Sequence, residues 1–181
     1  ASFTLEGIEL NQSMTRLDGN VWVGDGALGI EYVVARLADA PEVVFTDLGL
    51  ESTATAADDD KRFTVESRLN IEKVGAGDHA SGPFLTTFAM RDVEVNAWNG
   101  LLGAITDLQL LKSTQVAGLS RQAMMEQQMQ AMGAVSQGVK DLATSGVSIG
   151  FPEIKLQFVE GEFTGNAMFN HPQLADDQVT D

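Results

Sequence analysis

One short pattern of apolar and polar positions recurs along the chain. An apolar residue is followed by two spacers, and then by two apolar residues with a single residue between them. The final spacing of two is the period of a strand with one buried face, and a bend in the spacer would keep the first apolar residue on that face. The pattern occurs in LEGIEL from Leu5, FTDLGL from Phe45, MRDVEV from Met90 and FPEIKL from Phe151, with the bends predicted near Gly7, Asp47, Asp92 and Glu153.

A second pair of segments indicates an internal duplication. LGIEYV begins at Leu28 and LNIEKV at Leu69, 41 residues later, while LEGIEL and FTDLGL lie 40 residues apart. We infer two equivalent strand pairs, at about 5–44 and 45–83. The turn signals LDGN, ADDDK and GAGD fall between the expected strands and favour an antiparallel meander.

Two later segments have helical spacing. Apolar residues recur every three or four positions from Trp98 to Leu111 and from Met125 to Leu142, which predicts amphipathic helices at about 97–111 and 119–144. Closing strands are expected at about 150–169, with a hairpin turn at 159–161 and a polar tail over 170–181. The prediction is a single α+β domain over 2–169, in which a curved antiparallel sheet with an internal strand-pair repeat carries two helices packed on its apolar face.

Residues 24–29 read GDGALG, which matches the G-x-G-x-x-G of dinucleotide-binding loops. A nucleotide-dependent enzyme would use Gly24, Gly26 and Gly29 around the phosphates and Asp47 on the ribose. That use requires a helix over 28–38. Equivalence with LNIEKV predicts a strand there instead, with the glycines forming a bend, and the sequence leaves both structures open.

Net charge narrows the range of partners. The 181 residues carry a net charge of -15, which disfavours nucleic acid and a flat approach to an anionic membrane. The absence of cysteine excludes disulfides, thiolate metal sites and cysteine nucleophiles. No run of about 18 apolar residues occurs, so no membrane span is predicted. Because the sequence starts at Ala1 without methionine or a signal peptide, we expect a processed chain or a piece of a longer one.

Few residues suggest catalysis. His79 and His171 lie in expected loops without metal-pair spacing, and the run Asp58 to Asp60 lacks the alternation and glycine of a calcium loop. No Gly-x-Ser-x-Gly nucleophile motif is present. We therefore predict no catalytic residue, no metal and no cofactor, and expect that the protein is not an enzyme.

Methionines and phenylalanines supply the candidate binding residues. The methionine stripe of the second helix either fills gaps in a core or gives an adaptable surface for an apolar ligand. Phe151, Phe158, Phe163 and Phe169 are expected to pack beneath the same helices. In the second case the predicted ligand-binding residues are Met125, Met129, Met132, Phe151 and Phe158.

The chain resembles the YdgA-like family, a bacterial domain of unknown function. The resemblance rests on the LEGIEL and FTDLGL strands, the LNIEKV partner, MRDVEVNAW leading into a leucine-rich helix, the Met/Gln-rich helix and the closing FPEIKLQFVEGEFTG, over about residues 2–169. It implies an envelope protein of Gram-negative bacteria, tethered in the periplasm by an N-terminal hydrophobic segment that this sequence lacks. It supplies no functional residues.

Three functions remain open at this point. The first is a periplasmic module that binds an apolar ligand or lipid in a groove between sheet and helices. The second is an envelope module that binds other proteins, without a small ligand. The third is the nucleotide-dependent enzyme that uses GDGALG.

Overall fold

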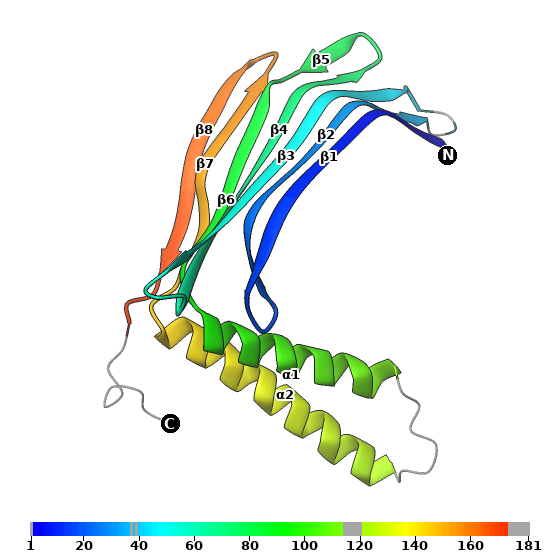
Figure 1. Ribbon diagram of the computed structural model, residues 1–181. Coiled ribbons are helices and arrows are strands. Elements are labelled where there is room, and N and C mark those ends of the chain that lie inside the picture. Colours follow the sequence, from blue (N-terminus) through cyan, green and yellow to red (C-terminus); the bar gives the residue numbers. More distant parts are fainter. Residues whose placement is uncertain (1, 37, 39, 114–120, 174–181) are drawn as a thin grey trace.

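The computed structural model describes residues 2–36, 38, 40–113 and 121–173. Expectations for 119–120 and for the tail from 174 onward lie outside the described residues. A single antiparallel sheet dominates the molecule and a pair of helices follows its sixth strand (Figure 1). The elements are β1 (Ser2–Asp18), β2 (Val21–Arg36), β3 (Val43–Ala57), β4 (Arg62–Ala76), β5 (His79–Ser81), β6 (Phe84–Glu94), α1 (Val95–Ser113), α2 (Arg121–Thr144), β7 (Ser148–Phe158) and β8 (Gly161–Asn170).

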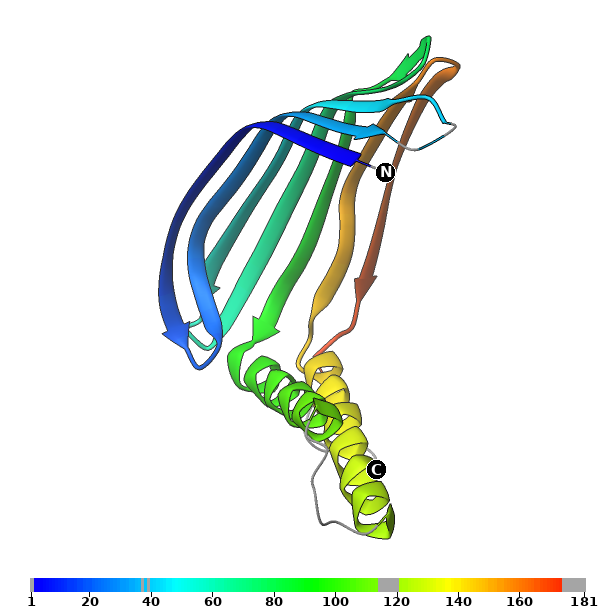
Figure 2. The same cartoon turned by 90° about the vertical axis from the view of Figure 1, so that its right-hand side faces the viewer.

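The strands lie in the order β1-β2-β3-β4-β6-β7-β8, and the short β5 pairs with the end of β4. Every pairing is antiparallel. The long strands bend strongly, so that the sheet is concave toward the side on which the helices project from its base (Figures 1 and 2). The predicted fold class is confirmed: a curved antiparallel meander with two helices.

The predicted bends restore the alternation of the motif strands. Gly7, Asp47 and Asp92 have φ of 65°, 50° and 57°, in the left-handed region. Near Glu153, the register of β7 shifts against β8 between Phe151 and Ile154. Glycine suits position 7 for a second reason, since a Cβ there would stand 2.4 Å from the Glu31 side chain.

A small core lies at the base of the sheet, where the helices join it. Its buried members come from three strands, from the first residue of α1 and from the residue just before β7: Val21, Phe63, Val93, Val95 and Val147. The ring of Trp98 packs edge-on against Phe63, with centroids 5.9 Å apart. Arg62 spans this junction, because its guanidinium donates to the carbonyl of Asp92 at 2.6 Å and to that of Ser145 at 2.7 Å.

The helices meet the sheet at this base and leave most of its face uncovered. Their main packing is with each other, and Gly138 of α2 lies so close to α1 that a Cβ would stand 2.9 Å from Cα of Leu101. The sequence predicted the two helices but placed them over the apolar face. Helical spacing shows which residues share a side, and does not show where a helix pair docks.

The bend at Asp47 gives the first prediction. We expect Asp47→Val to lower the free energy of unfolding by about 1–2 kcal/mol, because a branched side chain disfavours the left-handed backbone. Asp47→Gly should leave stability unchanged or raise it. Urea unfolding followed by circular dichroism measures both, and equal losses in the two variants would contradict the assigned backbone.

The helix contact gives the second prediction, with a matched control on the same helix. Gly133 has open space around its Cβ direction, so Gly133→Ala should raise the free energy of unfolding by about 0.5–1 kcal/mol through helix propensity. Gly138→Ala should lose that gain or lower stability, because the added methyl meets the α1 backbone. Thermal unfolding compares the two variants, and a similar rise in both would show that the helices do not approach closely at Gly138.

Candidate functional site

The candidate site is one face of the sheet. The pairing register of the strands aligns apolar residues of successive strands into rows that run across this face. Because directly opposite residues point to the same side, each row belongs to one face. We call this surface the apolar concave face, and its two central rows are Ile8, Ile30, Leu48, Ile71, Phe84 and Leu156, and Leu10, Leu28, Leu50, Leu69, Thr86 and Ile154.

Packing at the base identifies this face as the one that looks toward the helices. Val65 and Met90 pair across β4 and β6 and pack against the basal cluster, together with Trp98 of α1. Leu69 lies four residues along β4 from Val65, hence on the same side. Since the helices project on the concave side, the apolar rows line the hollow of the curved sheet (Figure 2).

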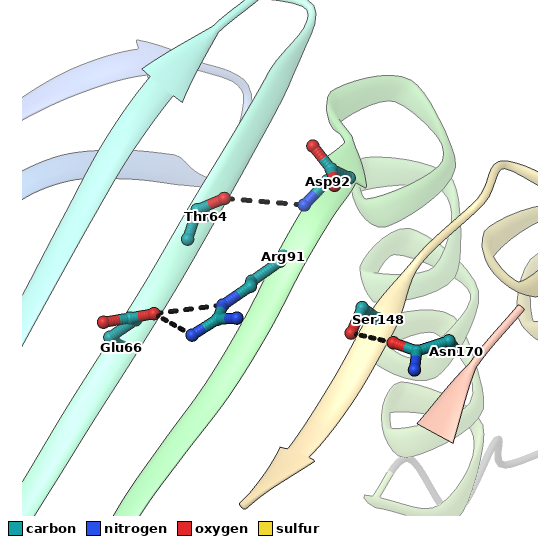
Figure 3. Close-up of polar contacts among 6 residues, drawn as sticks. All are labelled: Thr64, Glu66, Arg91, Asp92, Ser148 and Asn170. Atoms are coloured by element: carbon teal, nitrogen blue, oxygen red, sulfur yellow. Dashed lines mark hydrogen bonds and ion pairs between the residues drawn. The ribbon is translucent and has the colours of Figure 1, made fainter. Parts of the chain in front are cut away.

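The opposite face is polar. Arg91 donates through Nε and Nη2 to Oε1 of Glu66 at 3.0 and 2.7 Å, and Figure 3 shows this pair in front of the sheet with the helices behind it. The hydroxyl of Thr64 accepts the backbone N–H of Asp92 at 3.5 Å, on the ladder where the bend interrupts pairing (Figure 3). Alternating polar residues of β3 and β4 therefore face water while their neighbours line the concave face.

Shallow hollows on the polar side are lined by mixed charges and amides. One of about 430 Å³ runs over β1, β2 and β3, and another of about 470 Å³ over β3, β4, β6 and β7. Glu153 lines the second hollow, and its Oε1 lies 2.6 Å from Nζ of Lys155; this hydrogen bond lowers the pKa of the Glu153 carboxyl. Because the pKa is lower in the folded state, the ionised carboxyl stabilises the fold at pH values above its ordinary pKa of 4.5. This stabilisation is lost as the pH falls through the folded-state pKa. The carboxyl is more than a third exposed to solvent, which screens the interaction, so this contribution is small.

The apolar concave face is open to solvent in the described structure. Leu10 is 72% exposed, and Leu50 and Leu69, in the middle of the sheet, are 40% and 38% exposed. Sheets normally bury such a face against a second layer. Here the described helices cover only its base, so a broad apolar surface remains available to an occupant.

The predicted phenylalanines Phe151 and Phe158 lie on β7, where they stack with residues of β6. Phe151 packs edge-on against Phe88, and Phe158 against Phe84, each with ring centroids 5.6 Å apart. Seven residues of strand separate them by about 23 Å. Phe158 precedes the β7–β8 turn, at the end of the strand away from the helices, and Phe163 lies just beyond that turn. The expectation that Phe158 and Phe163 pack beneath the helices is wrong, because β7 runs away from the helix pair.

The predicted methionines lie on α2 and are exposed. Met125, Met129 and Met132 expose 61%, 69% and 59% of their surface, so they do not fill a core. Interior packing was one of two interpretations of this stripe, and the burial excludes it. The structure therefore separates the predicted binding residues into two places: the phenylalanines on the sheet and the methionines on the helix pair.

GDGALG lies inside β2, which runs unbroken from Val21 to Arg36. Gly24, Gly26 and Gly29 pair with residues of β1, and Asp47 lies on the neighbouring β3. A phosphate-binding loop needs a helix N-terminus at this point, and the strand replaces it. The segment 28–36 is thus a strand, as equivalence with LNIEKV predicted, and the geometry required for nucleotide binding by this motif is absent from β2.

The remaining polar candidates form no cluster. Asp58, Asp59 and Asp60 occupy the exposed β3–β4 turn with positive φ. His79 begins the short strand β5, where the sequence suggested a loop, and His171 packs its ring near Phe169, with centroids 6.3 Å apart. Within the described residues, no group of three or more potential ligands is placed to hold a metal ion. No helix in that same part is long and apolar enough to cross a membrane.

The sequence analysis did not propose the residues in the two central rows of the apolar concave face as binding candidates. Leu50 and Leu69 were recognised only as strand positions with one buried side. The signal was present in the repeated motif, whose last two apolar residues recur in neighbouring strands. What the motif does not reveal is whether another layer of the chain covers them.

Comparison with known proteins gives a family and no function. No curated protein and no solved structure matches the chain. The profile of one family, described as "Bacterial protein of unknown function (DUF945)", matches residues 1–180. The chain therefore belongs to the DUF945 family of bacterial proteins of unknown function.

Proposed function

We propose that this protein is a non-enzymatic module that holds an apolar ligand, most simply a lipid acyl chain, against its apolar concave face. The observation that carries the proposal is the pair of aligned apolar rows left open across the middle of the sheet. Curvature makes this surface a trough rather than a flat patch (Figure 1).

The free energy of burial supports an occupant. Removing apolar surface from water stabilises by roughly 25 cal/mol per Å², so a ligand that covers several leucines and isoleucines gains several kcal/mol. Charged side chains point to the other face, as the pair Glu66–Arg91 does, and so do not interrupt the trough. An uncharged apolar chain therefore suits this surface better than a polar metabolite.

Envelope placement is a second part of the proposal. Its support is the resemblance to YdgA-like proteins, which implies a periplasmic domain tethered by an N-terminal hydrophobic segment. Lipids are abundant in that compartment, so the setting agrees with the ligand class. Neither the placement nor the tether is needed for the binding experiment below.

An alternative function is protein binding at the sheet edge. β1 is an edge strand of 17 residues, and within the described chain it pairs only with β2. An exposed edge of this length can accept a strand from another protein. Phe3 and Leu10 would add apolar contacts there, since each is 72% exposed.

Native mass spectrometry on protein purified without harsh detergent tests the ligand proposal. The expected result is an extra mass, absent after denaturation, that lipid extraction identifies as an acyl-chain compound. Leu50→Gln with Leu69→Gln should reduce occupancy about tenfold or more, because each change places a polar group in the trough.

Adjacent residues on the same strands provide the matched control. Glu51→Gln with Arg68→Gln alters the polar face at the same height and should leave occupancy unchanged. Equal loss in both double variants, or no added mass in the wild type, would refute the apolar-ligand function. A ligand-free complex with another protein or copy, broken by charges introduced in β1, would favour the edge alternative.

A further inference from the structure

The outer side of α2 carries an apolar stripe that α1 does not cover. Met125, Met129, Met132 and Val139 expose between 53% and 69% of their surface. Their spacings of four, three and seven residues place them on one side of the helix. The side that faces α1 is different, since it includes the buried Ala131 and the closely approached Gly138. We call Met125, Met129, Met132 and Val139 the α2 stripe.

Charge is distributed unevenly between the helices and the sheet. Between residues 95 and 144 three acids are balanced by three bases, so this segment is neutral and the whole net charge of -15 resides elsewhere in the chain. α2 itself carries five glutamines and four charged residues, two of them acidic and two basic. The six charged residues of the segment are Asp107, Glu126, Asp141, Lys112, Arg121 and Lys140.

The helix pair also stands clear of the sheet. It projects from the base, and the far end of α2 is remote from every strand in both views (Figures 1 and 2). α2 has 24 residues and is therefore about 36 Å long, long enough to lie along a flat surface. A flat surface can therefore reach the far end of α2 without first meeting the acidic sheet.

We propose that the α2 stripe docks the protein on the surface of a lipid bilayer of low charge, with α2 lying in the headgroup region. Flexible methionine side chains suit a disordered apolar surface, and their insertion needs no basic residues where the lipids carry no net charge. A second copy is a poorer occupant, because two chains of charge -15 repel each other. A strongly anionic bilayer is poorer for the same reason.

This proposal goes beyond ligand binding in the trough and does not depend on it. Docking uses residues of α2, whereas the trough uses residues of β1 to β7. The two functions can therefore fail separately, and the variants that test them do not overlap.

Flotation of the full chain with phosphatidylcholine vesicles tests the proposal. The wild type should float with the vesicles. Met125→Gln with Met129→Gln and Met132→Gln should weaken binding at least about tenfold, because the apolar contact is lost while helix propensity is kept. Phosphatidylserine in the vesicles should weaken wild-type binding at low salt, and added salt should restore it.

Two controls separate docking from misfolding and from ligand loading. Glu126→Gln changes a polar residue about a quarter turn round α2 from the stripe and should float like the wild type, as should Leu50→Gln with Leu69→Gln in the trough. Circular dichroism must show the same helix content in the triple methionine variant. A wild type that does not float with neutral vesicles would overturn the proposal, as would a folded triple variant that floats equally well, or a stripe that forms only a homodimer.

Discussion

An apolar sheet face without a second layer is the feature on which the rest of this structure depends. Leu50 and Leu69 lie at the centre of a large antiparallel sheet and are still more than a third exposed. In a two-layer domain a helix or a second sheet would cover them. Here the two helices pack on each other and meet only the base, so the buried core is small and most of the apolar face stays uncovered by the described residues.

The bends in the strands and the placement of charged residues both fit a sheet with one uncovered apolar face. Left-handed residues interrupt the alternation in three motif strands, at Gly7, Asp47 and Asp92, and a register shift does so in β7, which accommodates apolar residues three positions apart. The acids and bases alternate onto the other face, where pairs such as Glu66–Arg91 keep it solvated. A large negative charge also limits association between copies that each expose apolar surface. Together these features favour a module with an open trough.

The sequence predicted the sheet from local signals. The spacing of three in LEGIEL and FTDLGL located bends at Gly7 and Asp47, and equivalence with LNIEKV favoured a strand at LGIEYV, which overlaps GDGALG. These inferences succeeded because strand alternation and left-handed bends are set within a few residues. Both helices were likewise found from their spacing.

The candidate site was harder to predict, because it depends on which apolar side chains the rest of the chain leaves uncovered. A methionine such as Met129 has the same spacing whether its helix side is buried or exposed, and only the position of the helix pair decides between them. Phe158 was expected beneath the helices, but ten residues of extended chain from Ser148 carry it to the far end of the sheet. Long-range placement of this kind leaves little local signature.

The central claim is that an acyl chain occupies the apolar concave face. Fluorescence quenching of a tryptophan by a lipid with brominated acyl chains tests it most directly. Leu50→Trp places the reporter in the trough, and Glu51→Trp places it on the polar face at the same height, with quenching of Trp22 and Trp98 measured in the wild type. The account predicts strong quenching of the tryptophan at 50 and little at 51. Equal quenching at the two positions, or none at 50 while the lipid is bound, would contradict it.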